Sequence, residues 1–121
     1  MKITLPWPDM RLMPNRKNGR HWGGTQAAKV RARQDGYLAA KQALRSSTIN
    51  GETLSLRITF VAPDRRHRDL DNLLACIKPH IDGVAQALGV DDKQFRPITI
   101  DAHHDPKKVG YVALEVGLGI S

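Results

Sequence analysis

The most constraining feature of this sequence is an unbroken helical pattern of aliphatic residues that starts at position 70. Apolar side chains recur there at spacings of three and four residues, at Leu70, Leu73, Leu74, Ile77, Ile81, Val84 and Leu88. This spacing places them on one side of a helix, which we predict over residues 71–88 and which needs an apolar surface to pack against. Pro79 removes one backbone hydrogen bond, so we expect a kink between Ala75 and Pro79, and we expect Gly89 to end the helix.

Alternating apolar residues predict four β-strands. The clearest pattern covers residues 53–62, where every second side chain is apolar and Pro63 follows directly. Shorter alternating segments predict strands over residues 2–7, 98–102 and 112–118. Prolines near the end of the first strand indicate the edge of a sheet. The turn-like sequence DPKKVG between the last two strands predicts that they form a hairpin.

Another helix is expected between the first two strands. It would begin with Thr25 as N-cap and run to about Ser46, through an alanine-rich segment. Larger apolar residues recur in it every seven positions, at Val30, Tyr37 and Leu44. The resulting order β-α-β-α-β-β predicts an α+β fold, a single small two-layer domain over residues 1–121 in which two helices pack on a mixed or antiparallel sheet.

Three absences narrow the class of protein. No apolar segment reaches the roughly 18 residues that a membrane span needs, so no membrane partner is expected. The single Cys76 excludes an internal disulfide and a cysteine-based zinc site. The first seven residues are too short and too interrupted by proline for a signal peptide. We therefore expect a cytoplasmic protein.

Positive charge is concentrated in the first half of the chain. The net charge is +7, but residues 1–68 hold 14 basic and 4 acidic side chains, whereas residues 69–121 hold 5 basic and 8 acidic ones. A basic surface can simply keep a domain soluble. It can also bind a polyanion, because Lys and Arg that neutralise phosphates release counterions. Composition alone leaves both interpretations open.

The densest charge lies between the predicted strand at 53–62 and the helix after it. This junction reads DRRHRDLDN and runs directly from arginines into Asp69 and Asp71. A surface ion-pair cluster would contribute little, but the position brings these side chains together from rigid elements. Helical residues two apart point in nearly opposite directions, so the two aspartates can share a ligand only if one lies outside the helix. We expect Asp71 as N-cap, with capping alone as its alternative role, and Asp69 in extended backbone before it.

A second acidic pair, Asp91 and Asp92, follows the helix end. Taken alone it indicates a polar turn. A helix about 27 Å long separates it from the first pair. The pairs therefore meet within one chain only if the helix is shorter, bent or folded back by the loop, and otherwise a second subunit supplies one of them. Paired carboxylates beside a basic surface suit Mg²⁺, which binds carboxylates together with water and phosphate oxygens.

Lys78 is the basic side chain best placed to assist such a site. It lies seven residues after Asp71 and returns to nearly the same helix face, where it could contact a scissile phosphate. The alternative is an i, i+4 ion pair with Asp82. The remaining candidates, His67, His80, His103 and His104, lack the spacing of a metal site and are interpreted as surface or packing residues.

Together these motifs resemble the RusA family of Holliday-junction resolvases. The likeness rests on RDLDNL after a strand, Lys78 with Asp82, and DD-x-Q from Asp91, with ITLPWP and GRHW in the first part of the chain, and it covers essentially the whole chain. It implies a homodimeric, Mg²⁺-dependent endodeoxyribonuclease, bacterial or phage-encoded. Such an enzyme resolves four-way DNA junctions by paired symmetric nicks in recombination and repair.

The resemblance also implies roles for individual residues. Asp69, Asp71 and Asp92 match the family's three carboxylates, with Asp91 as a neighbouring substitute, and they would hold Mg²⁺, for which Mn²⁺ can substitute. Lys78 matches the family lysine, although it stands farther from the DLDN motif. The residues expected to contact DNA are Arg65, Arg66 and Arg68 with the loop residues Asn15, Arg16, Lys17 and Arg20.

Two rival interpretations stay open. Pro63-Asp64 with Asp91-Asp92-Lys93 also fits the short PD…D-x-K nuclease pattern, which would make Asp64 and Lys93 essential and Asp69 dispensable. The other rival is a non-catalytic basic DNA-binding module, in which the carboxylates only cap helices and form ion pairs. No helix-turn-helix motif is visible that would support this second rival.

Overall fold

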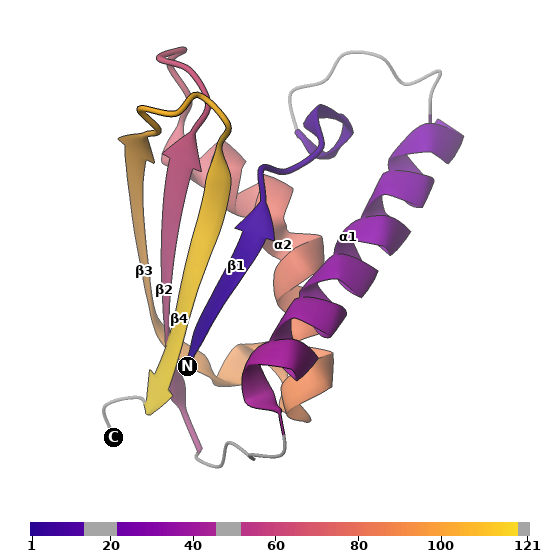
Figure 1. Cartoon of the computed structure of the whole chain (residues 1–121). Coiled ribbons are helices and arrows are strands. Elements are labelled where there is room, and N and C mark those ends of the chain that lie inside the picture. The colour runs from indigo at the N-terminus through magenta and orange to yellow at the C-terminus, as the bar shows by residue number, and fades with distance from the viewer. Residues whose placement is uncertain (14–21, 46–51, 119–121) are drawn as a thin grey trace.

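The computed structural model describes residues 1–13, 22–45 and 52–118. Two long helices lie on one side of a four-stranded sheet, which makes a two-layer α+β domain (Figure 1). The main elements are β1 (Lys2–Pro6), α1 (Trp22–Leu44), β2 (Leu54–Ala62), α2 (Leu70–Leu88), β3 (Phe95–His104) and β4 (Tyr111–Leu118). Two short 3-10 helices are η1 (Met10–Leu12) and η3 (Asp92–Gln94). The predicted fold class and the order β-α-β-α-β-β are confirmed.

The sheet is mixed, with strand order β1-β4-β2-β3. β4 runs antiparallel to both β1 and β2, whereas β3 runs parallel to β2. The predicted hairpin between the last two strands is therefore wrong, because β2 lies between them. The physical reason is the crossover through α2, which returns the chain parallel to β2 and leaves β4 to pair on the other side of β2.

A buried aspartate holds the connection that carries the chain over the end of β2. The backbone N–H of Asp105 donates to the carbonyl of Ala62, 2.8 Å away. The Asp105 carboxylate accepts from the backbone N–H groups of Lys107, Val109 and Gly110 at 2.9, 3.3 and 2.9 Å. These bonds, first that from Gly110, lower the pKa of Asp105. The DPKKVG segment is thus a turn, as its composition indicates, but one that spans a strand.

The core lies between β2 and α2. The alternating side chains of β2 are almost completely buried, namely Leu54, Leu56, Ile58 and Phe60. They belong to the same cluster as the buried face of α2, which includes Leu73, Ile77, Ile81 and Val84. α2 continues through Pro79 and ends at Gly89, which has a φ of 71°. In the part of the chain that the structure describes, neither long helix has the length and hydrophobicity needed to cross a bilayer.

The α1 helix differs from its prediction at its start and on its buried face. It begins at Trp22, so the predicted Thr25 N-cap is wrong and Thr25 lies inside the first turn. Of the predicted repeat, Leu44 is buried and Tyr37 packs against the core, whereas Val30 is 58% exposed. The rest of the buried stripe consists of small residues four apart, at Ala28, Ala32, Gly36 and Ala40.

Small residues are needed because the α1 and α2 backbones touch. A Cβ atom added to Gly36 would collide with the carbonyl oxygen of His80, and one added to Gly83 would collide with that of Arg33. The two glycines thus allow α1 and α2 to pack at their closest approach. This contact fixes the position of α2 against the rest of the domain. It therefore also fixes the position of the aspartates at the start of α2.

Candidate functional site

The segment between β2 and α2, residues 63–69, forms a compact loop that we call the arginine loop. Asp64 organises it, because its Oδ1 atom accepts from the Arg66 backbone N–H at 3.0 Å and from Arg68 Nη2 at 2.8 Å. The hydrogen bond from the Arg66 backbone, followed by the contacts with Arg68, lowers the pKa of Asp64. The carboxylate therefore stays ionised and holds the two arginines in different directions.

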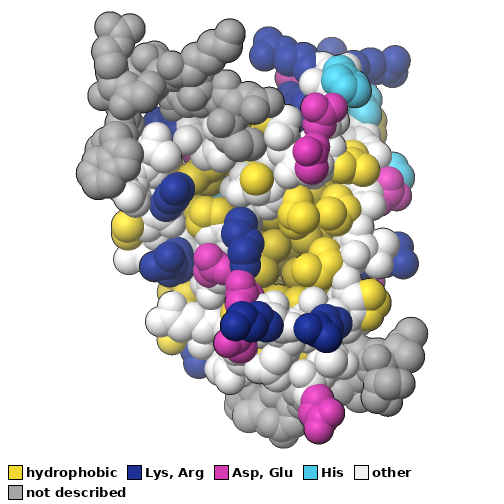
Figure 2. Space-filling model, turned by 180° about the vertical axis from the view of Figure 1, so that it is seen from behind, with side chains coloured by type: hydrophobic (Ala, Val, Ile, Leu, Met, Phe, Trp, Pro, Cys, Tyr) yellow, Lys and Arg dark blue, Asp and Glu magenta, His cyan; other side chains and the backbone are white. Residues whose placement is uncertain are grey.

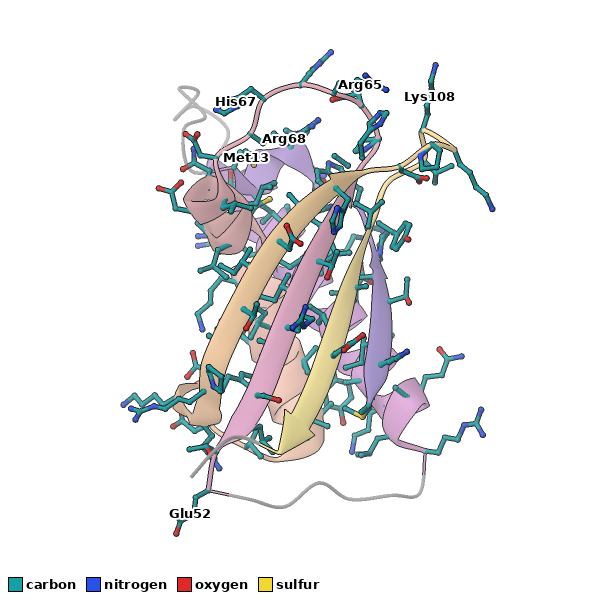
Figure 3. All side chains as sticks on the ribbon, turned by 90° about the vertical axis from the view of Figure 1, so that its left-hand side faces the viewer. Met13, Glu52, Arg65, His67, Arg68 and Lys108 are labelled. Atoms are coloured by element: carbon teal, nitrogen blue, oxygen red, sulfur yellow. The ribbon has the colours of Figure 1, made fainter. Side chains whose placement is uncertain are left out.

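Arg68 points into the protein. Its side chain is 11% exposed, it donates to the Arg66 carbonyl at 3.2 Å, and its guanidinium lies 5.3 Å from the centroid of the Trp7 ring. Arg66, in contrast, is 84% exposed, and Arg65 is also exposed. Of the three arginines expected to contact DNA, Arg65 and Arg66 thus face solvent and Arg68 stabilises the loop (Figure 3).

Asp69 and Asp71 lie at the N-terminus of α2, directly after this loop. Asp69 has extended backbone (φ −76°, ψ 137°) and occupies the N-cap position, although its side chain makes no capping hydrogen bond. The predicted N-cap role of Asp71 is wrong, because the N-cap lies two positions earlier, at Asp69, and Asp71 belongs to the first turn of the helix. Both carboxylates are exposed, and the helix N-terminus favours their negative charge.

The Asp69 carboxylate contacts a neighbouring histidine. Its Oδ1 atom lies 3.1 Å from His67 Nε2, and both side chains are well exposed, by 59% and 91%. The pair of aspartates therefore offers carboxylate oxygens to solvent on one side of the loop. Figure 3 shows His67 and Arg65 spread along the loop at the end of the molecule where Lys108 also lies.

Asp91 and Asp92 have separate roles. Asp91 caps η3: its Oδ1 accepts from the Lys93 backbone N–H at 2.9 Å, and Gln94 Oε1 accepts from the Asp91 backbone N–H at 2.9 Å. Asp92 instead forms a short ion pair with Lys78 on α2, and this hydrogen bond is the main reason that its pKa is lowered. Asp92 is therefore the member of the pair that reaches α2.

Lys78 lies between two carboxylates. Its ammonium group donates to Asp82 Oδ1 at 3.0 Å and to Asp92 Oδ2. Partial burial opposes its charge, but the hydrogen bonds to Asp92 and Asp82 outweigh that effect, so the pKa of Lys78 is raised. The ion pair with Asp82 that the spacing allows is thus present, and a second one joins it.

The two acidic pairs lie at opposite ends of the domain. Phe95, directly after η3, pairs with Leu54 at the start of β2, whereas the arginine loop follows Ala62 at its end. Gln94 also donates to the carbonyl of Glu52 at 3.4 Å, and Glu52 lies opposite the arginine loop in Figure 3. Nine residues of β2 span about 26 Å, so one chain does not bring Asp92 to Asp69.

The described residues accordingly contain no group of three His, Cys, Asp or Glu side chains that could share a metal ion. The reason is that α2 is continuous from Leu70 to Leu88 and does not fold back at Pro79. The arrangements in which the two acidic pairs meet within one chain, by a shorter, bent or folded-back helix, are therefore not found among the described residues. Among the predicted DNA contacts, Asn15, Arg16, Lys17 and Arg20 lie outside the described residues.

The PD…D-x-K interpretation has no common site in this structure. Asp64 lies in the arginine loop and binds Arg66 and Arg68, whereas Asp91 and Lys93 belong to η3 at the other end of β2. Sequence reasoning missed the organising role of Asp64. The sequence did contain a signal for this role. In an Asx turn an Asp side chain accepts from the backbone N–H two residues later, and Asp64 and Arg66 have this spacing.

Comparisons with known proteins add one relative. No family model matches this chain. A protein of Xylella fastidiosa (strain Temecula1 / ATCC 700964), described as "Uncharacterized protein", is 41% identical over 96 residues, which cover 77% of this chain and 61% of the relative. The chain thus spans less than two thirds of the length of this relative. The similarity shows that a related sequence occurs in this bacterium. It gives no information about the activity of either protein.

Proposed function

We propose that this chain is a Mg²⁺-dependent, structure-selective endodeoxyribonuclease of the RusA type, which resolves Holliday junctions by paired nicks in recombination and repair. One observation carries the proposal. Exposed cations, Arg65 and Arg66, and exposed carboxylates, Asp69 and Asp71, follow one another along a single loop and helix start. Arginines bind phosphate groups, and carboxylates bind the metal that phosphodiester hydrolysis uses.

The donor chemistry of this end fits Mg²⁺. Mg²⁺ is commonly held by one or two carboxylates, with waters and substrate phosphates as the other ligands. Asp69 and Asp71 would supply these two carboxylates, and their side chains are exposed. When bound, Mg²⁺ polarises the phosphodiester and lowers the pKa of the attacking water.

The protein side chains orient the substrate. Arg65 and Arg66 hold the phosphates next to the scissile one, because they extend into solvent from a loop that Asp64 keeps closed. Lys78, kept protonated by Asp82 and Asp92, lies on the same face of α2 as Asp71, where it would bind a phosphate after exchanging these partners. Seven residues of helix separate Lys78 from Asp71, which is about 10 Å along the axis.

A second copy of the chain would complete the site. In a two-fold dimer with antiparallel α2 helices, Asp92 and Lys78 of one copy approach Asp69 and Asp71 of the other. Supporting this arrangement, exposed hydrophobic side chains gather on the face shown in Figure 2, with acidic and basic groups around them. Leu70 of α2 and Ile98 of β3 are 42% and 45% exposed. A two-fold dimer also presents two equivalent sites to the two equivalent strands of a junction.

The test is cleavage of a synthetic four-way junction with and without Mg²⁺. We expect paired symmetric nicks in Mg²⁺ or Mn²⁺ and none in EDTA, with a linear duplex of the same sequence as control. The Asp71→Asn variant should bind the junction with unchanged affinity and lose cleavage by at least about 100-fold, because it removes one metal ligand. Full cleavage by this variant in Mg²⁺ would contradict the proposal.

One observation favours a second candidate, a non-catalytic DNA-binding module. Within the described part of one chain the carboxylates do not gather around a common point, and Asp91 and Asp92 already have structural partners. The same assay separates the two candidates. Tight junction binding without nicks in either metal ion would establish the binding module and exclude the nuclease.

A further inference from the structure

A cleft of about 440 Å³ opens beside the arginine loop, at the end of the sheet where β2 and β3 finish. The apolar part of its lining, which we call the floor, consists of Trp7, Phe60, Ala62, Leu73 and Ala102. Asp64, Arg68, His103 and His104 also line the cleft, and the exposed Arg65 and Arg66 form its rim. This volume is within the range of about 300–1,000 Å³ that is typical of small-molecule sites. The cleft combines a surface for a flat apolar group with a surface for an anion.

The floor is rigid. Phe60 and Leu73 are 0% and 3% exposed, and the Trp7 ring meets Phe60 edge to face, with centroids 6.3 Å apart and an interplanar angle of 82°. The Arg68 guanidinium lies over the Trp7 ring, 5.3 Å from its centroid, and Asp64 holds Arg68 in place at 2.8 Å. An occupant would therefore contact Trp7, which Phe60 and Arg68 hold in place before binding, and this preorganisation lowers the entropy lost on binding.

The cleft lies next to the candidate active site. Leu73 of the floor is one helical turn after Asp69, and its backbone N–H donates to the Asp69 carbonyl at 3.1 Å. Arg65 and Arg66 of the rim belong to the loop that ends at Asp69. A ligand in the cleft is therefore positioned by the same loop and helix start as a phosphate at the carboxylates.

We propose that this cleft is a subsite for one unstacked nucleotide of the DNA substrate. The base packs on the floor beside Trp7, and the phosphate of the same nucleotide meets Arg65 and Arg66. Aromatic residues that stack bases, beside cations that bind the backbone, are the usual means of holding single-stranded nucleic acid. This inference rests on the proposed function, because it takes DNA as the substrate. It adds that the protein recognises a base that is unstacked at the branch point.

The chemistry of the cleft excludes simpler occupants. An inorganic phosphate would use only the arginine rim and leave the apolar floor exposed. An apolar ligand would leave the rim arginines without an anionic ligand, although Arg66 lies 3.8 Å from the Asp64 carboxylate. A nucleotide satisfies both surfaces, because its base is flat and largely apolar while its phosphate is an anion.

Trp7 allows binding to be measured without cleavage. The chain has two tryptophans, so the Trp22→Phe variant leaves Trp7 as the sole indole reporter. In EDTA, we expect Trp7 fluorescence to change on addition of a duplex with one bulged nucleotide. The affinity for that duplex should be about tenfold higher than for the same duplex with an abasic bulge, because base stacking on aromatic residues supplies the difference. Equal affinities for the two duplexes would overturn the subsite.

A cleft-filling variant tests the location. Ala102 is exposed and lines the floor, so Ala102→Trp should fill the cleft, abolish the preference for the bulged base and leave affinity for plain duplex unchanged. The matched control is Thr99→Trp, because residues 99 and 102 of β3 point to opposite faces of the sheet. Circular dichroism and thermal melting check that both variants are folded. Retention of the base preference in Ala102→Trp would overturn the proposal.

A mononucleotide separates this proposal from the proposed function. Deoxythymidine monophosphate should change Trp7 fluorescence at concentrations where inorganic phosphate has no effect. Ala102→Phe, which fills the cleft without adding an indole, should remove the response. This result would support the subsite even if the protein cleaves no junction. A missing response to the mononucleotide, with junction cleavage intact, would overturn the subsite and leave the nuclease standing.

Discussion

The two ends of α2 carry similar charges and use them differently. At its N-terminal end Asp69, Asp71 and Arg66 extend into solvent. At the other end Asp91 caps η3 and Asp92 is bound to Lys78. The comparison shows that a carboxylate's neighbours, rather than its place in an acidic motif, decide whether it can bind a ligand.

The largest difference between the ends should be in activity. Asp69→Ala should reduce junction cleavage by at least about 100-fold without loss of stability, because Asp69 makes no capping hydrogen bond. Asp91→Ala should keep cleavage and lose about 1 kcal/mol of unfolding free energy, because it removes the cap of η3. Nick counting and urea denaturation measure the two effects. Equal losses of cleavage in both variants would erase the distinction between the ends.

The next difference concerns DNA affinity. Replacing Arg65 and Arg66 together by Ala should weaken junction binding by about tenfold at moderate salt and reduce the slope of log K against log salt by about two. Arg68→Ala should act mainly on stability, because its side chain is 11% exposed and bonded to Asp64. Binding isotherms at several salt concentrations test this. An unchanged salt slope in the double variant would show that the rim arginines do not contact phosphates.

The stability of the contact between α1 and α2 should depend on pH, because this contact contains His80. His80 is 3% exposed, its Nδ1 has no hydrogen-bond partner in the described structure, and burial lowers its pKa despite the attraction of Asp35. The unfolded state therefore binds the proton more readily, and stability should fall as pH drops below about 6.5, by up to roughly 1.4 kcal/mol per pH unit. Denaturation of the wild type and His80→Leu between pH 5 and 8 checks this. The leucine variant should lose that part of the slope.

The smallest effect is expected for the Lys78–Asp92 pair. Pairing with Lys78 lowers the pKa of Asp92, so the stabilisation is present above the unfolded pKa and is lost as pH falls through the folded one. Both side chains are substantially exposed, by 48% and 38%, so the coupling should be small and should shrink with salt. A double-mutant cycle with Lys78→Met and Asp92→Asn measures it. A large coupling energy that does not change with salt would contradict this expectation. It would mean that the Lys78–Asp92 pair is held more rigidly than the exposure of the two side chains indicates.

Local patterns predicted the elements that local physics controls. The alternation of β2 and the aliphatic spacing of α2 reflect burial on one face, so both elements lie within a residue or two of their predicted bounds. The N-cap at Asp71 was misplaced by two positions, because both Asp69 and Asp71 suit a helix start. The seven-residue repeat of α1 held only in part: Leu44 is buried and Tyr37 packs against the core, but Val30 is exposed. The contact with α2 selects small residues such as Gly36 along the rest of the helix.

The site was only partly predictable for the same reason. The composition of the arginine loop identified Arg65, Arg66, Asp69 and Asp71 as candidates. The inward position of Arg68 depends on Trp7, which lies in a different part of the sequence and reaches the loop only through the folded sheet. No spacing within the loop could show that contact.

By itself, the sequence determined the type of each main element, the order of those elements and the junction where opposite charges meet, because each depends on residues close together in the chain. The tertiary structure decided which strands are neighbours, how closely α1 and α2 approach, and that the two acidic pairs lie at opposite ends of the domain. These features depend on contacts between distant segments. Their free energy comes from burying surfaces against one another, and that complementarity exists only once the chain has folded.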